Sequence, residues 1–134
     1  MKNTPKLSKG FTILELIIVL GFLSLLLIFF FLQKNNIDAM KRDEKRKIAI
    51  NAMYYALEEG FFVKNNYYPE NISAENLKTL DPQLFTDPFG LNLGKKGSSY
   101  QYEAANCSDG KCREYTLRAT LEKEDDYVKK NRHN

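Results

Sequence analysis

The chain has 134 residues, and its 20 lysines and arginines exceed its 17 aspartates and glutamates by three. This length fits one small domain, and so small an excess of positive charge argues against a nucleic-acid-binding face. With one histidine and two cysteines, a structural zinc site would need carboxylate ligands, so we predict no metal and no other cofactor.

Residues 1–10, MKNTPKLSKG, hold three lysines and no acid, so the whole excess of charge lies ahead of Phe11. Residues 11–32, FTILELIIVLGFLSLLLIFFFL, contain 18 apolar side chains among 22. As a helix this run would be about 33 Å long, enough to cross a bilayer core of about 30 Å. A basic segment before an apolar run is typical of a targeting signal, and the run predicts a transmembrane segment.

The junction KGFTILELIIVL resembles the processing site of type IV pilins and of the related type II secretion pseudopilins. In that family a membrane aspartic peptidase, the prepilin peptidase, cuts after the glycine, and the apolar helix stays on the mature chain. The resemblance implies cleavage of a leader, residues 1–10, between Gly10 and Phe11 and N-methylation of Phe11. It also implies a role in assembly for Glu15, the fifth residue of the mature chain.

Glu15 is the only charged residue between Lys9 and Lys34. A carboxylate inside a membrane segment is costly and therefore indicates a functional site. After cleavage, the α-amine of Phe11 would lie one helical turn away, within reach of Glu15 of the same chain or of a neighbour. The alternative interpretation is a carboxylate that only reaches the lipid headgroups.

Residues 33–66 are predicted to continue the helix beyond the membrane. Acid-to-base pairs at i,i+4 spacing, Asp38 with Arg42 and Asp43 with Lys47, predict a solvated stem, and Asp43 with Arg46 adds an i,i+3 pair. The basic residues of this stem leave two other interpretations open. One is a patch for anionic lipid or nucleic acid, and the other, by the positive-inside rule, is a cytoplasmic C-terminal domain.

The later part of this helix is amphipathic and should pack on a sheet. Its apolar stripe consists of Ile50, Met53, Leu57 and Phe61. Asn65-Asn66 predicts the end of the helix, because asparagine tolerates the left-handed backbone of a C-cap. Residues 67–99 are predicted to form a loop with a short helix from Ser73 to Leu80. Within this loop, residues 87–90, DPFG, resemble a stretch that precedes the sheet in pilins and pseudopilins.

Residues 100–122 predict a β-hairpin around Asp109-Gly110, a two-residue loop typical of a type I′ turn. The resulting register pairs Tyr102 with Leu117 and Tyr100 with Ala119 on one apolar face, so the alternation and the turn agree. The helix–sheet core is therefore expected to include, besides the helix stripe, Tyr100, Tyr102, Leu117 and Leu121.

The same register places Cys107 opposite Cys112 on the polar face, where a disulfide can close. A disulfide would indicate an oxidising, extracytoplasmic location; the alternative is two free thiols or half of a metal site. Residues 123–134 form a charged tail, in which Tyr127-Val128 is a candidate third strand. Glu58-Glu59 is expected to be solvated, and His133 to be an ordinary tail residue.

No nucleophile–base constellation or phosphate-binding motif is found, so we predict no enzyme. The expected fold is α+β and pilin-like, with a long N-terminal helix on a small antiparallel sheet. The expected function is that of a type IV pilus subunit held in the cytoplasmic membrane before export, serving adhesion, twitching or DNA uptake. Its partners would be other subunits, the prepilin peptidase, the assembly machinery and the bilayer, without direct nucleic-acid binding. The alternatives are a secretion pseudopilin and a single-pass anchored binding domain that never polymerises.

Overall fold

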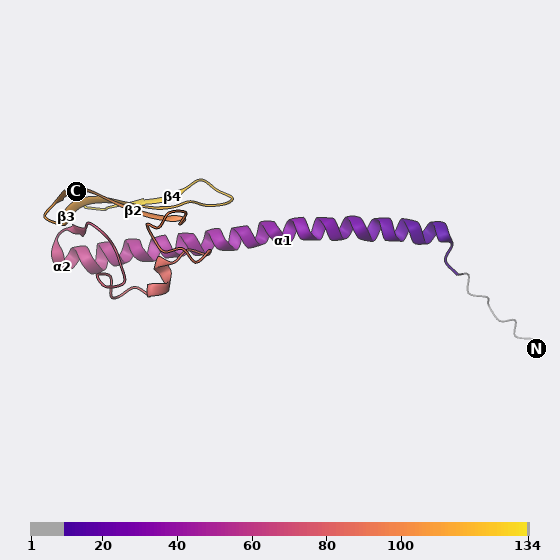
Figure 1. The fold of residues 1–134 in the computed structure, drawn as a ribbon, viewed down its shortest axis with the longest axis horizontal. Coiled ribbons are helices and arrows are strands. Elements are labelled where there is room, and N and C mark those ends of the chain that lie inside the picture. The colour runs from indigo at the N-terminus through magenta and orange to yellow at the C-terminus, as the bar shows by residue number, and fades with distance from the viewer. Residues whose placement is uncertain (1–9, 134) are drawn as a thin grey trace, which may run out of the picture. The chain divides into compact units, whose positions relative to one another are not determined.

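The computed structural model describes residues 10–133 (Figure 1). The leader predicted for residues 1–10 therefore lies, apart from Gly10, outside the described residues. The elements are α1 Ile13–Tyr55, the π-helix η1 Ala56–Phe62, α2 Val63–Asn65, β1 Tyr68–Pro69, the 3-10 helix η2 Pro82–Phe85, β2 Tyr100–Ser108, β3 Lys111–Ala119 and β4 Tyr127–Lys130. The chain divides into two compact units, Met1–Ile37 and Asp38–Asn134, and α1 contributes residues to both. The predicted α+β architecture, a long helix on a small antiparallel sheet as in pilins, is confirmed.

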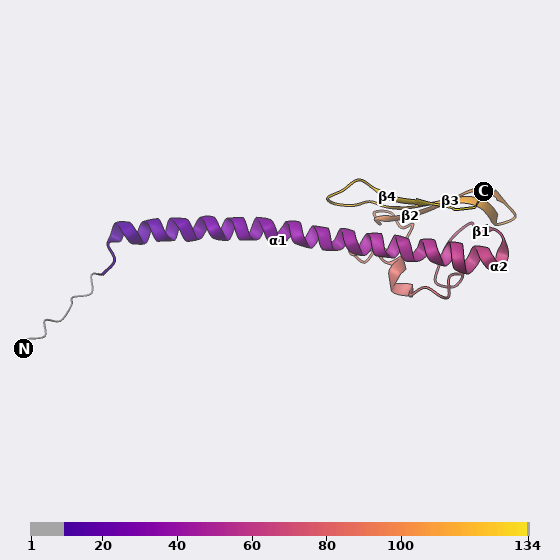
Figure 2. The ribbon, with the colours of Figure 1, turned by 180° about the vertical axis from the view of Figure 1, so that it is seen from behind.

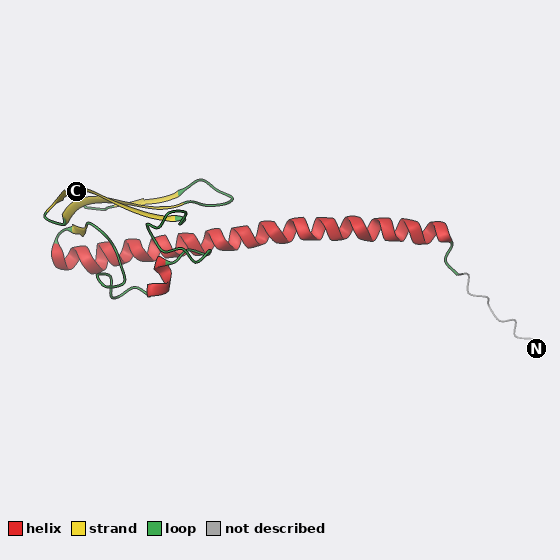
Figure 3. Cartoon of the chain, in the orientation of Figure 1, coloured by secondary structure: helices red, strands yellow, loops and turns green. Residues whose placement is uncertain are grey.

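The helix runs without a break from α1 through η1 and α2 (Figure 3). It ends where Asn66 adopts a left-handed backbone with φ 58°, which confirms the predicted end. The π-helical segment was not predicted. Such segments are rare and occur mostly as single-turn bulges, and the pattern of apolar residues alone gives no signal for one.

The sheet has β3 at its centre. β2 pairs antiparallel along one edge of β3, while β1 and β4 share the other edge at its two ends. The predicted hairpin register is confirmed, with Tyr100 opposite Ala119 and Tyr102 opposite Leu117. In Figures 1 and 2 the sheet lies on one side of the second unit's part of α1, and η2 lies on the opposite side.

The core of the second unit lies between the helix and the sheet. The side chains of Ile50, Met53 and Leu57 are fully buried, as is that of Leu117. Loop residues close the remaining sides of this core, namely Ile72, Leu77, Leu80 and Phe85. Of the other residues expected in the core, Tyr100 and Leu121 are buried, whereas Phe61 and Tyr102 are partly buried against it.

The short helix expected from Ser73 to Leu80 is absent, and the chain forms turns there. A single helical turn closes when the Leu77 N–H donates to the Ser73 carbonyl at 3.0 Å. The Asn76 side chain accepts from the Ser73 N–H and donates to the Asn71 carbonyl, so it competes with continued helical pairing. The short helical segment of this loop is η2 instead, capped by the Asp81 carboxylate.

The disulfide between Cys107 and Cys112 is present, as predicted. Its predicted position on a polar face is wrong for Cys112, which is fully buried and belongs to the core. The alternation of the hairpin is disturbed by Asn106, whose φ is 55°, and Tyr68 of β1 pairs directly with Cys112. The tip of the hairpin is therefore covered on one side by a strand that the sequence pattern did not reveal.

Candidate functional site

The peptide junction at Gly10-Phe11 lies in exposed, non-helical chain immediately before α1. Thr12 caps the helix, because its hydroxyl accepts a hydrogen bond from the Glu15 N–H at 3.2 Å. Thr-x-x-Glu before an apolar run is a recognised helix-start pattern, and this signal was available in the sequence but not used. The cap fixes Glu15 in the first turn of α1, next to the proposed cleavage point.

The apolar part of α1 has no covering within the described residues. All residues from Gly10 to Ile37 are exposed, and apolar side chains point in every direction around the helix. A helix that is apolar all round is normally buried in a protein core or in lipid. This helix is long and apolar enough to span a membrane.

The Glu15 carboxylate forms no hydrogen bond or ion pair with any residue from Gly10 to His133. The next charged residue along the described helix is Lys34, about 29 Å away at 1.5 Å per residue. A partner for this carboxylate must therefore come from outside the described residues or from another molecule. Such a partner is expected, because a carboxylate left without one inside lipid is energetically costly.

The stem that was expected to be solvated is instead partly buried. Asp43 and Arg46 are 2% and 1% exposed and pair at 2.7 Å, and Arg46 also reaches Glu122 at 2.8 Å. Arg42 binds both oxygens of Glu122 with two of its nitrogens. This network, Arg42, Asp43, Arg46 and Glu122, joins the helix to the chain after β3. The prediction failed because Glu122 is distant in sequence.

The electrostatics of this network follow from its contacts. Burial alone would raise the pKa of the Asp43 carboxyl, but N–H donors of Glu122 and Lys123, with Arg46, hold it below its usual range. Hydrogen bonds from Arg42 and then Arg46 lower the pKa of Glu122 to about 2. The folded second unit therefore favours both carboxylates in their ionised form.

A second network surrounds Glu58 on η1, which is 1% exposed rather than solvated as expected. Its carboxylate accepts hydrogen bonds from the hydroxyls of Tyr68 and Tyr115 and from the Arg132 N–H. His133 stacks on Phe62 and places Nε2 3.7 Å from the Glu58 carboxylate. Burial, together with Glu58, raises the pKa of Tyr68 to about 12. Arg132 and His133, which were predicted to belong to a charged tail, therefore pack against η1 near the C-terminal end of the long helix.

A third buried carboxylate organises the loop that precedes the sheet. Asp87 accepts hydrogen bonds from the N–H groups of Phe89, Leu91 and Ser99, and from the Ser99 hydroxyl. Burial would raise the pKa of Asp87, but these donors hold it below its usual range. The DPFG stretch is therefore a fixed turn, with Gly90 in the left-handed region at φ 85°.

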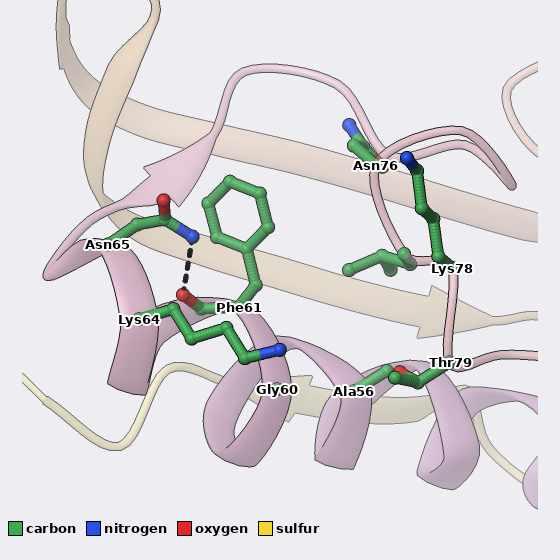
Figure 4. A pocket seen from close by; sticks show the side chains of 9 residues that line it. Ala56, Gly60, Phe61, Lys64, Asn65, Asn76, Lys78 and Thr79 are labelled. Atoms are coloured by element: carbon green, nitrogen blue, oxygen red, sulfur yellow. Dashed lines mark hydrogen bonds between the residues drawn. The ribbon is translucent and has the colours of Figure 1, made fainter.

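A hollow of about 180 Å³ lies beside the π-helix, as Figure 4 shows. The side-chain amides that line it are already hydrogen-bonded. That of Asn65 donates to the Phe61 carbonyl, and that of Asn76 accepts from the Ser73 N–H. The hollow remains open where Gly60 lacks a side chain. A Cβ built at Gly60 would lie 3.6 Å from the Thr79 hydroxyl, so alanine would fit by filling this space.

Comparison of the chain with protein-family models, curated proteins and solved structures found no match. The function is therefore inferred from the chain's own residues. Four features bear on it: the exposed apolar helix, Glu15 in its first turn without a partner in the described part of the chain, the exposed junction before it, and a disulfide-containing second unit.

Proposed function

We propose that the chain is a pilin-like subunit, which is processed after Gly10 and polymerises through its apolar N-terminal helix. The observation that carries this proposal is a helix exposed and apolar all round, whose lone carboxylate Glu15 lies in the first turn beside an accessible Gly10-Phe11 bond. Lipid would cover the apolar surface of this helix before assembly, and the same helices of neighbouring subunits would cover it in the filament.

Cleavage would create the α-amine of Phe11 near the positive end of the helix dipole, one turn from Glu15. An ammonium–carboxylate pair in lipid or in a packed helix bundle offsets the cost of burying each charge alone. If the amine belongs to a neighbouring subunit, the pair also fixes the axial position of one helix against the next. The interface between successive subunits is then heterologous and builds an open filament.

The proposed location is the cytoplasmic membrane before assembly, with the second unit outside, and an extracellular pilus afterwards. The disulfide supports this side of the membrane, because such bonds persist in oxidising compartments. We favour a type IV pilus over a secretion pseudopilus. The cysteine pair favours the type IV pilus, although the four-residue loop between Cys107 and Cys112 leaves little of the large disulfide-bounded surface that many pilins carry.

The proposal is tested by mass spectrometry of the chain's N-terminus in cells that possess a prepilin peptidase. We expect the chain to begin at Phe11 and to carry an N-methyl group. Gly10→Leu should leave a precursor ten residues longer, since the peptidase pocket accepts only a small residue, while Gly10→Ala serves as the matched small control. An intact Met1 terminus in wild type would support the rival function, a single-pass anchored domain that does not polymerise.

A further inference from the structure

A hollow of about 370 Å³ lies on the second unit between the DPFG turn and the chain that follows β3. Its size falls in the range of pockets that hold small molecules. Phe89 forms one wall and is 63% exposed. The ring is therefore available to a ligand that enters the hollow.

The turn holds Phe89 in a fixed position. The buried Asp87 carboxylate accepts the Phe89 N–H and, on its other oxygen, the N–H and hydroxyl of Ser99. The guanidinium groups of Arg42 and Arg46 pack on the ring at 5.5 and 5.2 Å from its centroid. Both arginines come from α1, and the Phe89 side chain nevertheless stays 63% exposed.

Polar groups around the hollow are free to bind a ligand. Arg46 uses Nε for Ser99 and Nη1 for Asp43 and Glu122, which leaves Nη2 without a partner among the described residues. Arg46 lines the hollow, but its side chain is only 2% exposed, so Nη2 can contribute little to binding a ligand. The Gln101 amide and the Thr120 hydroxyl also line the hollow and form no hydrogen bond with described residues.

The lining is electrically balanced, because Arg46 and Glu122 carry opposite charges and bind each other at 2.8 Å. The free groups include donors and acceptors, and the aromatic wall offers an electron-rich face to C–H groups. A pyranose sugar has this same combination, with an apolar C–H face and a rim of hydroxyls. We propose that the hollow is a binding site for a neutral pyranoside.

The test is saturation-transfer NMR on the full chain in phosphocholine micelles, whose headgroups contain no sugar. The probes are the methyl glycosides of glucose, galactose and N-acetylglucosamine, with glucuronate as the charged comparison. We expect transfer to at least one neutral glycoside. Phe89→Ala should weaken this binding at least about fivefold, since it removes the aromatic contact. Tyr55→Ala, which removes an aromatic side chain of comparable exposure, 56% against 63% for Phe89, away from the hollow, should leave binding unchanged.

A second variant, Gln101→Ala, should weaken binding about two- to tenfold through loss of its hydrogen bonds, whereas Gln83→Ala should not. Absence of transfer to all three glycosides, or equal binding by the Phe89→Ala chain, would overturn the proposal. A preference for glucuronate of tenfold or more would overturn the assignment to a neutral sugar. The experiment uses unassembled protein, so its failure leaves the filament proposal standing.

Discussion

At the scale of single residues, three carboxylates have different physical roles. Glu15 lacks a partner in the described chain, whereas Asp43 and Asp87 are buried and surrounded by donors. Sequence reasoning singled out Glu15 because it is the one charge in a long apolar run. It missed the burial of Asp43 because the Glu122 N–H that binds it lies 79 residues away. It missed that of Asp87 because its nearby donors belong to an irregular loop, where no repeating pattern indicates which side chain is buried.

Glu15→Ala should still insert in the membrane and still be processed, but it should lose filament assembly. The substitution removes the only carboxylate available to the Phe11 amine and leaves the apolar helix intact. Ser24→Ala is the matched control, since the Ser24 hydroxyl is satisfied within the helix by the Gly21 carbonyl. Electron microscopy of the two strains provides the readout. Filaments of normal number with Glu15→Ala would contradict the assigned role.

The lowered pKa of Glu122 predicts a dependence of stability on pH. The pKa of Glu122 is about 2 in the folded chain, against an ordinary value of 4.5, so its ionised carboxylate stabilises the fold fully only above about pH 5. This stabilisation should be lost as the pH falls from about 5 towards 2. The tyrosine band of the near-UV circular dichroism spectrum follows the second unit alone, because the chain has no tryptophan and all eight tyrosines lie there.

Glu122→Gln should flatten this acid dependence and lower the free energy of unfolding at pH 7. Asp125→Asn is the control, because Asp125 has no ion pair among the described residues. If the wild-type and Glu122→Gln chains lost stability in parallel below pH 5, the Glu122 carboxylate would not be responsible for that loss.

At the scale of elements, short sequence motifs predicted those features that neighbouring residues determine, namely the hairpin register and the end of the helix. Asp109-Gly110 set the register of the hairpin, and Asn66 marked the end of the helix. The two-residue strand β1 and the π-helix η1 carry no comparable signal. Both depend on contacts of the folded second unit, such as the pairing of Tyr68 with Cys112 and the hydrogen bonds to Glu58.

The packing of the helix on the sheet predicts unequal effects for two methionines of α1. Met53→Ala should destabilise the second unit by about 2–5 kcal/mol, because Met53 is fully buried and leaves a cavity. Met40→Ala should change stability by no more than about 0.5 kcal/mol, because Met40 is 62% exposed. Thermal unfolding followed by tyrosine circular dichroism measures both, and equal effects would contradict this packing.

Reduction of the disulfide should cost about 2 kcal/mol, a modest amount because the enclosed loop is short. The effect should appear as faster hydrogen exchange at the hairpin tip, while the strand centre near Leu117 stays protected. A chain with both Cys107→Ala and Cys112→Ala should exchange at the tip like the reduced wild type, with or without reductant. Unchanged exchange at the tip after reduction would show that β1 alone holds this segment.

At the scale of the whole molecule, composition and structure agree that the chain has two dissimilar parts. In the second unit the buried carboxylates are hydrogen-bonded, and the apolar side chains of the helix, sheet and loops bury one another in a core. The apolar helix before it does neither, since it exposes large hydrophobic side chains from Phe11 to Leu32, and Glu15 has no partner for its carboxylate among residues 10–133. Such a surface requires lipid or other helices, and a filament subunit encounters both in turn.

The central claim is most directly tested by shearing cells that produce the chain and examining the released fraction. Labelled electron microscopy and mass spectrometry of that fraction should find filaments that contain the chain, beginning at Phe11. Recovery of the chain solely in the membrane fraction, from cells whose other pilins assemble normally, would contradict the proposed function.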